Sequence, residues 1–266
     1  MKRNHLHLVF QDILQGFSSW RIWLLLGWRD INLRYRRSTL GPFWITLSMA
    51  TMIYSMGFLY GKLFEIDLSV YYPYIATGMV TWTFISTLIN DLVEALSKAS
   101  GFIKQIKLPY TIYILRVLTS NFIVFLHNFL AIIPILLFFN TGITLLLIFV
   151  LLLNILLLLI CCFCYGFIFS LLGTRFQDIK PIIGSVLQIC FLLTPILWMP
   201  QMLPERFNYL ASANPFYQLV NLIRDPLIGQ MPSLFTYGYI SLMILGGFIV
   251  MIFLLWRTRH RIAFWL

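Results

Sequence analysis

The stretch that decides the fold is residues 143–172, which read ITLLLIFVLLLNILLLLICCFCYGFIFSLL and contain no charged side chain. A helix needs about 20 consecutive apolar residues to cross the hydrocarbon core of a bilayer. Because backbone groups find no water there, such a segment crosses as a helix that satisfies its own hydrogen bonds. With 60% hydrophobic and 11% charged residues overall, the chain is predicted to be an integral membrane protein, and a soluble globular protein is excluded.

Comparable stretches on both sides of this one predict five further spans. They lie at residues 43–62, 74–96, 112–139, 180–199 and 235–256. The second of these needs Asp91 and Glu94 near a headgroup end, and the uncharged part of the fourth is slightly short. Little sequence remains for a soluble domain. We therefore predict an all-α membrane protein with six transmembrane helices in a single domain, residues 1–266.

Positive charge is distributed unevenly between the two sides that these spans define. Six spans place both termini on one side, and all but three of the 19 Lys and Arg residues lie there, the exceptions being Lys62, Arg206 and Arg224. Cytosolic loops carry an excess of Lys and Arg, so both termini are expected in the cytosol. The net charge of +10 therefore indicates orientation and contact with membrane lipids, and no nucleic-acid partner is expected.

A basic, Trp-rich segment precedes the first span. Residues 18–40 place apolar side chains near helical spacing and basic ones mostly on the other arc, and Gly41-Pro42 then ends the segment. This pattern predicts an amphipathic helix at the inner membrane interface, in contact with lipid phosphate or a partner protein. Its candidate contact residues are Trp28, Arg29, Asp30, Arg34, Tyr35, Arg36 and Arg37.

Residues 95–108, between the second and third spans, are too short for a domain and are predicted to form a helical turn or two parallel to the membrane. Glu94 and Lys98 stand in the favourable i,i+4 order for an ion pair, and Asp91 lies one turn earlier on the same face. Proton relay is the alternative role for these acids. The spacing favours the ion pair.

Residues 200–230 form an unusually long outer segment that is rich in proline. Leu203, Phe207 and Leu210 repeat helically, as do later residues, which predicts two short re-entrant helices broken at Asn214-Pro215. Irregular backbone at membrane depth is tolerated only against protein or a water-filled cavity. A cavity is therefore expected nearby.

The remaining reactive residue types do not form a recognisable site. The cysteines lie in apolar spans, where thiols behave as small apolar residues, so neither a disulfide nor a metal site is predicted. They are Cys161, Cys162, Cys164 and Cys190. His7 and Asp12 fit an H-x4-D acyltransferase pattern that has no accompanying motif, and we interpret it as a coincidence.

The order of these segments resembles a known family. Residues 28–31 (WRDI) followed by 34–44 (RYRRSTLGPFW) are similar to the signature of ABC-2 type permeases, the membrane subunits of bacterial O-antigen, capsule and teichoic-acid exporters. Leu108-Pro109, residues 175–179 (RFQDI), and Asn214-Pro215 followed by Arg224 also resemble the family by position. Together these matches cover nearly the whole chain.

The resemblance implies a homodimer in the bacterial inner (cytoplasmic) membrane, a polymer path at the dimer interface, and two copies of a cytosolic P-loop ATPase. The chain itself has no G-x-x-x-x-G-K-[ST] motif, so it is expected to be non-catalytic and without a cofactor, with ATP and Mg bound by the partner. The substrate would be a lipid-linked polysaccharide, whose pyrophosphate is a further candidate ligand of the arginines in 18–40.

The resemblance also assigns roles to particular residues. Residues 95–108 would be the coupling helix for the ATPase, residues 174–180 an inner loop, and 200–230 an outer gate. The coupling residues are Lys98, Phe102, Lys104, Gln105, Lys107 and Pro109, the inner-loop residues are Arg175 and Asp178, and the gate residues are Asn214, Pro215 and Arg224.

Aromatic side chains are candidates for lining the path, because sugar rings stack on aromatic planes. Tyr54 and Phe58 share a face of the first span, and Phe191 and Trp198 share a face of the fifth. For any single ring, helix packing or lipid contact is the favoured interpretation.

Three other functions remain open at this stage. An ABC-2 exporter of a drug or peptide would share the fold and the partner. A proton-coupled secondary transporter would need no ATPase and would depend on Asp91. An integral-membrane glycosyl- or acyltransferase is disfavoured because its acid and metal motifs are missing.

Overall fold

The computed structural model describes residues 4–36, 38–202, 204, 206 and 208–266, and these residues form helices and no strand. The elements are α1 (Asn4–Ser18), α2 (Trp20–Tyr35), α3 (Phe43–Leu63), α4 (Leu68–Val93), α5 (Ala95–Lys98), α6 (Ser100–Gln105), α7 (Tyr110–Phe138), α8 (Leu145–Arg175), α9 (Ile179–Leu193), η1 (Pro200–Met202), α10 (Asn208–Ser212), α11 (Pro215–Leu227), α12 (Leu234–Thr258) and α13 (Ile262–Trp265).

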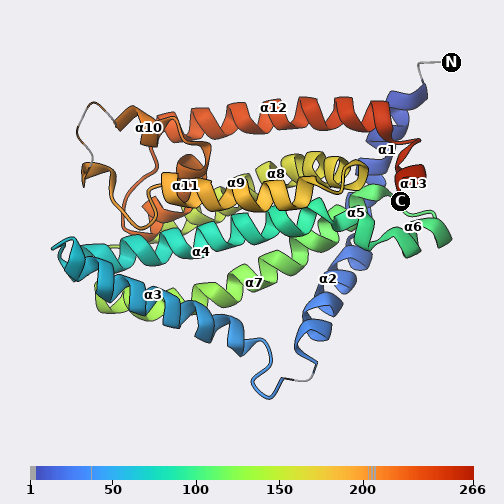
Figure 1. Ribbon diagram of the computed structural model, residues 1–266. Helices are drawn as coiled ribbons and strands as arrows, with labels where there is room; N and C mark the ends of the chain where they lie inside the picture. The colour runs from blue at the N-terminus through green and yellow to red at the C-terminus, as the bar shows by residue number, and fades with distance from the viewer. Residues whose placement is uncertain (1–3, 37, 203, 205, 207) are drawn as a thin grey trace.

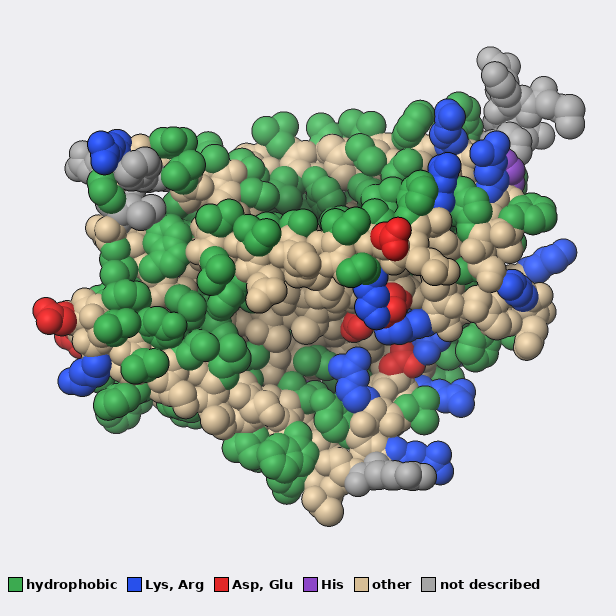
Figure 2. Space-filling view, in the orientation of Figure 1, with side chains coloured by type: hydrophobic (Ala, Val, Ile, Leu, Met, Phe, Trp, Pro, Cys, Tyr) green, Lys and Arg blue, Asp and Glu red, His purple; other side chains and the backbone are tan. Residues whose placement is uncertain are grey.

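The long helices run back and forth along one direction, with α4 packed against α3, α7, α8 and α9 (Figure 1). Both termini lie at one end together with α5, α6 and α13 (Figure 1). Most Lys and Arg side chains in view gather towards this end (Figure 2), which we call the basic end. The opposite, far end carries the α3–α4 and α7–α8 turns and α10. Both termini share one end because the chain runs the length of the bundle an even number of times.

Four of the described helices are long and apolar enough to cross a membrane, namely α3, α7, α8 and α12. The protein is therefore a multi-pass membrane protein, but its six expected spans are not all supported. Helix α4 has 26 residues, or about 39 Å at 1.5 Å per residue, yet it carries many polar side chains. Thr77 and Thr81 hydrogen-bond to carbonyl oxygens of their own helix at 2.7 and 2.8 Å, which lets them lie buried at its centre.

The expected continuous helix over 180–199 is wrong beyond Leu193. Helix α9 has only 15 residues, about 22 Å, and Thr194 adopts extended backbone angles at φ −88° and ψ 133°. The cause is Pro195, because the residue before a proline is disfavoured in the α conformation. The remaining depth is taken up by the irregular segment 194–199, which we call the α9 break.

Other predicted boundaries also change. The predicted interface helix 18–40 is a helix only from Trp20 to Tyr35, and the second predicted span starts earlier, at Leu68. The predicted coupling helix 95–108 is two short helices, α5 and α6, separated at Ala99. Within 200–230, α10 and α11 are separated at Asn214, while Leu203 and Phe207 of the expected helical repeat lie outside the described residues.

Candidate functional site

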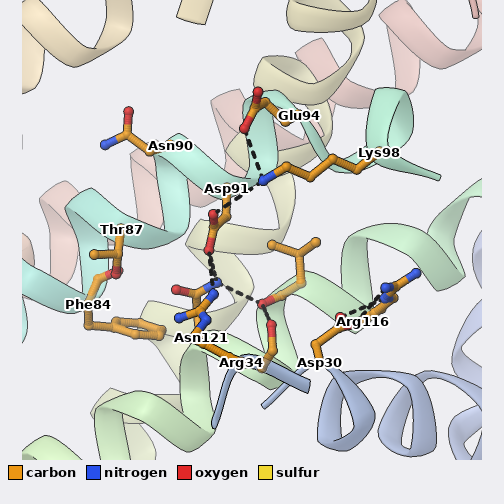
Figure 3. Close-up of polar contacts among 12 residues, drawn as sticks. Asp30, Arg34, Phe84, Thr87, Asn90, Asp91, Glu94, Lys98, Arg116 and Asn121 are labelled. Atoms are coloured by element: carbon orange, nitrogen blue, oxygen red, sulfur yellow. Dashed lines mark hydrogen bonds and ion pairs between the residues drawn. The ribbon is translucent and has the colours of Figure 1, made fainter. Parts of the chain in front are cut away.

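A cluster of charged and polar side chains connects five helices at the basic end (Figure 3). We call it the charged cluster, and it consists of Asp30, Arg34, Asp91, Glu94, Lys98, Arg116, Asn121 and Lys180. Its members come from α2, the end of α4, α5, α7 and the start of α9. The cluster therefore lies where the interface helix, the segment 95–108 and the membrane bundle meet.

The strongest contact in the cluster joins α2 to α7. Arg116 donates two hydrogen bonds to Asp30, of 2.7 Å from Nε and 2.6 Å from Nη2, and both side chains are about one-quarter exposed. This two-point geometry fixes the orientation of both groups. Gly27, one turn before Asp30, lets α2 approach closely, because a Cβ there would lie 2.9 Å from Thr119 of α7. Sequence reasoning placed Asp30 at the lipid interface and missed Arg116, although an ionisable residue inside a predicted span was a signal.

The two acids at the end of α4 are both paired. Glu94 contacts Lys98 at 3.0 Å, which confirms the predicted i,i+4 ion pair, and Lys180 of α9 at 2.7 Å. The hydrogen bond from Lys180 outweighs partial burial and, together with Lys98, holds the pKa of Glu94 below its ordinary value. Asp91 accepts a hydrogen bond of 3.0 Å from Asn121 and lies 3.9 Å from Arg34.

Part of the charged cluster lines a small open pocket of about 160 Å³, namely Asp30, Arg34, Asp91, Lys98 and Arg116. Acids and bases around it are interleaved, so their charges largely compensate one another. Such an arrangement positions helices and can exchange ion-pair partners when the helices move.

The segment between α4 and α7 is anchored at its other end by a residue that sequence reasoning dismissed. Asp12 of α1 is 2% exposed and accepts hydrogen bonds from the backbone N–H groups of Tyr110 and Thr111 at 3.2 and 3.1 Å. It also accepts from the Thr111 hydroxyl at 2.9 Å and lies 3.4 Å from Arg259 of α12. Asp12 thus caps the start of α7, directly after Pro109, and joins α1 and α12 to that point. Its partners lie far along the chain, so the local pattern gave no signal.

Between these two anchors the predicted coupling residues extend from the bundle. Phe102 is 46% exposed, and Gln105 and Lys107 are also exposed. Lys104 donates a hydrogen bond of 2.8 Å to the carbonyl oxygen of Leu266, near α13. Lys98 belongs to the charged cluster, so its role is at least partly structural.

The other residues predicted at the basic end have separate surroundings. Trp28, Arg29 and Arg36 are exposed and Tyr35 is half-buried, whereas Arg37 lies outside the described residues. Of the inner-loop residues, Asp178 is exposed just before α9. The Arg175 guanidinium lies 4.9 Å from the ring centre of Phe176 and 5.5 Å from that of Trp265.

At the far end, Arg224 on α11 supports the α9 break. Its side chain is 1% exposed, donates a hydrogen bond of 2.9 Å to the carbonyl oxygen of Pro195, and lies 3.8 Å from the ring centre of Tyr74. The Tyr74 hydroxyl donates to the same carbonyl, and the Tyr71 hydroxyl donates to that of Leu197. Side chains of α4 and α11 therefore satisfy backbone oxygens that a longer helix would have satisfied itself. Sequence reasoning selected Arg224 and missed both tyrosines.

The predicted break at Asn214-Pro215 is present. Asn214 caps α11 by accepting hydrogen bonds from the backbone N–H groups of Phe216 and Tyr217 at 2.9 and 3.3 Å, and Pro215 is the first helical residue. The Asn214 amide also donates a hydrogen bond of 3.0 Å to the hydroxyl of Thr194. The start of α11 is therefore tied to the α9 break.

The four aromatic side chains proposed to line the path differ in their contacts and exposure. Tyr54 packs against Tyr72 with ring centres 6.2 Å apart, and Phe191 packs against Trp82 at 5.6 Å. Trp198 donates a hydrogen bond of 3.1 Å to the carbonyl oxygen of Leu192, and Phe58 is 58% exposed. Tyr54, Phe191 and Trp198 thus contact neighbouring parts of this chain while Phe58 is exposed, and a role of these rings in lining a path stays a prediction.

A stripe of uncharged polar side chains, which sequence reasoning missed, lies on α4 and α9. It comprises Thr83, Thr87, Asn90, Ser185 and Gln188, all exposed or half-exposed, and we call it the polar face. Helical spacing carries the stripe on α4 onward to Asp91 and Glu94 of the charged cluster. Figure 2 shows the corresponding region as a hollowed band, poor in hydrophobic side chains, that leads to charged groups.

The long apolar helices and the basic end define a multi-pass helical membrane protein, and comparison with known proteins gives its family. The sequence model of the ABC-2 type transporter family matches residues 21–228, which run from α2 to the end of α11, and the chain belongs to this family. Among similar proteins are two O-antigen export system permease proteins RfbA from Klebsiella pneumoniae. Each is 27% identical to this chain, over 229 and 231 residues, covering 84% of this chain and 85% of the relative.

Proposed function

We propose that this chain is the permease subunit of an ATP-driven exporter that moves a lipid-linked, O-antigen-like polysaccharide across the bacterial inner membrane. The permease would act as a homodimer with two copies of a P-loop ATPase, which bind ATP and Mg. The basic end would face the cytosol, following the excess of Lys and Arg there. Helices α4 and α9 would complete six spans, α9 together with its break.

The observation that carries this proposal is the arrangement around α5 and α6. Helix α6 extends from the basic end with exposed side chains, whereas α5 packs against α7 and α8, and Glu94 and Asp12 anchor the segment at both ends. A partner that pushes on α6 would therefore move α4 and α7 directly. This is what a subunit needs when the energy source lies in another protein.

The polar face supports a polysaccharide cargo over a drug or peptide. Hydroxyl and amide groups without charge suit a neutral polyhydroxylated chain, and they are costly against lipid tails. The Thr87 hydroxyl and one amide N–H of Asn90 donate within their own helix, at 2.6 Å to the Thr83 carbonyl oxygen and 2.9 Å to that of Ser86. Their acceptor oxygens stay available to water or sugar. In the dimer this face would line the path.

The partner is tested by purifying the tagged chain in mild detergent from native membranes and assaying for a P-loop ATPase and ATP hydrolysis. We expect the double variant Phe102→Glu/Lys107→Glu to lose the ATPase. Lys62→Glu, a charge reversal at the far end, is the matched control and should retain it. A chain that purifies without any nucleotide-hydrolysing partner would overturn the proposal.

The cargo is tested in cells that lack the chain. We expect lipid-linked polysaccharide to accumulate on the cytosolic face, where an externally added antibody or lectin cannot reach it until the membrane is permeabilised. Normal surface polysaccharide with increased sensitivity to drugs would instead favour export of a small molecule.

A further inference from the structure

Helix α13 lies beside α6 at the basic end, and it is outside the region that the family match covers (Figure 1). It follows α12 after a turn, in which the backbone N–H of Arg261 donates to the carbonyl oxygen of Thr258 at 2.7 Å. Ile262 is fully buried in the core. The first residue of α13 is therefore fixed to the bundle, although the helix is short.

Two further contacts fix the other end of α13. The Arg175 guanidinium lies 5.5 Å from the ring centre of Trp265, which joins α13 to the end of α8. Lys104 of α6 donates a hydrogen bond of 2.8 Å to the carbonyl oxygen of Leu266. Helix α13 thus connects α8 and α12 of the bundle to α6.

These contacts leave apolar side chains unused on both short helices. Phe264 of α13 is 87% exposed, while Phe102 and Ile106, in and just after α6, are 46% and 49% exposed. Large exposed apolar side chains on two helices that contact each other mark a surface for another molecule.

The side chains of residues 100–107 and 257–266 carry only positive charge, of which Arg259 is already paired with Asp12 of α1. Residues 100–107 contain Lys104 and Lys107, residues 257–266 contain three arginines, and neither stretch contains an acidic residue. A protein that covers this surface is expected to offer apolar sockets bordered by acidic side chains. We infer that α13 and α6 form one composite docking surface for the ATPase, with Phe264 as an apolar anchor separate from the coupling helix. This inference rests on the proposed function.

A protein is the favoured occupant because of how α6 is placed. A helix lying flat on lipid buries its apolar face and keeps its basic face in water. Every residue from Phe102 to Lys107 except Ile103 is exposed, so α6 extends from the bundle with both its apolar and its basic sides open. A helix that projects in this way is suited to insertion into a cleft of a partner protein.

The test measures the affinity of the purified ATPase for the full-length chain in nanodiscs. Phe264→Ala should weaken binding about tenfold or more, the effect of removing one buried aromatic anchor. Phe138→Ala is the matched control, because Phe138 is 81% exposed at the far end and should leave affinity unchanged. Equal affinities of wild type and Phe264→Ala would overturn the inference and leave Phe264 a contact for lipid. Wild-type chain that binds no ATPase would instead overturn the proposed function.

A second measurement does not depend on the alanine variant folding normally. Phe264→Cys, in a chain with Cys190 replaced by Ser, should react with a water-soluble maleimide when alone and be protected when the ATPase is bound. The other cysteines are buried in apolar spans, where burial disfavours the reactive thiolate. Labelling at the same rate with and without bound ATPase would overturn the inference.

Discussion

Replacing Asp30 by Asn tests whether the interface helix is fixed to the bundle. Charge-assisted hydrogen bonds contribute about 1.5–3 kcal/mol, and Arg116 keeps its charge in a site where it is only 24% exposed. We therefore expect Asp30→Asn to lower the free energy of unfolding by about 2 kcal/mol, since the remaining charge loses its compensation. At about 2–4 °C per kcal/mol for a chain of this size, Tm should fall by about 4–8 °C.

The assay is thermal unfolding of the purified chain in detergent, followed by tryptophan fluorescence. Arg116→Gln and the double variant complete a double-mutant cycle, and Arg29→Gln, an exposed arginine on the same helix, is the control. Because the single variants remove one shared interaction, the double variant should lose about 1 kcal/mol less than the sum of the two. Additivity within about 0.5 kcal/mol would refute the argument, because residues that do not interact are expected to add.

Three further predictions concern other parts of the site. Because the folded pKa of Glu94 lies below its ordinary value of 4.5, its ion pairs stabilise the fold above that pH and are lost as the pH falls through the folded pKa. Tm of the wild type and Glu94→Gln measured between pH 7 and pH 3 should therefore converge in acid, and a constant difference would contradict this. Thr87→Cys should be labelled by a membrane-impermeant thiol reagent, with Leu245→Cys on α12 as the unlabelled control; equal labelling would argue against a water-filled path. Asp12→Asn should lower ATPase stimulation by the chain, because it weakens the cap of α7, while Asp12→Glu should restore part of it; unaltered stimulation in Asp12→Asn would exclude Asp12 from coupling.

Much of the fold could be predicted because apolar length and charge act locally. Helices α3, α7, α8 and α12 begin and end within three residues of the predicted spans. Hydropathy could not show that α9 ends at Leu193, because residues 194–199 are as apolar as a helix at that depth would be. Pro195 was the sequence signal for the end of the helix. The backbone oxygen that the break leaves without a helical partner accepts hydrogen bonds from Tyr74 and Arg224, and these contacts depend on how the helices pack.

In the candidate site, too, contacts set by local spacing could be predicted and contacts between distant residues could not. The Glu94–Lys98 pair could be predicted because it depends only on helical spacing. The Asp30–Arg116 and Asp12–Thr111 contacts join residues 86 and 99 positions apart, so they depend on how α1 and α2 pack against α7. The tight approach at Gly16, where a Cβ would clash with Thr111, is part of that packing. No local pattern contains that information.

The distribution of contacts indicates which parts would move together during a transport cycle. Helices α4 and α7 pack extensively against each other, and α2 follows α7 through Asp30 and Arg116. A push on α6 would therefore displace α2, α4 and α7 as one body, because all three are fixed near the ends of the coupling segment. Helix α9 packs against α4 over a smaller surface than α7 does, with Phe191 against Trp82, and it is held at its ends by Lys180 and by its break. Since a small contact is easier to rearrange than a large packed helix face, relative motion of α9 against α4 is the expected response. That motion would open and close the polar face along its whole length.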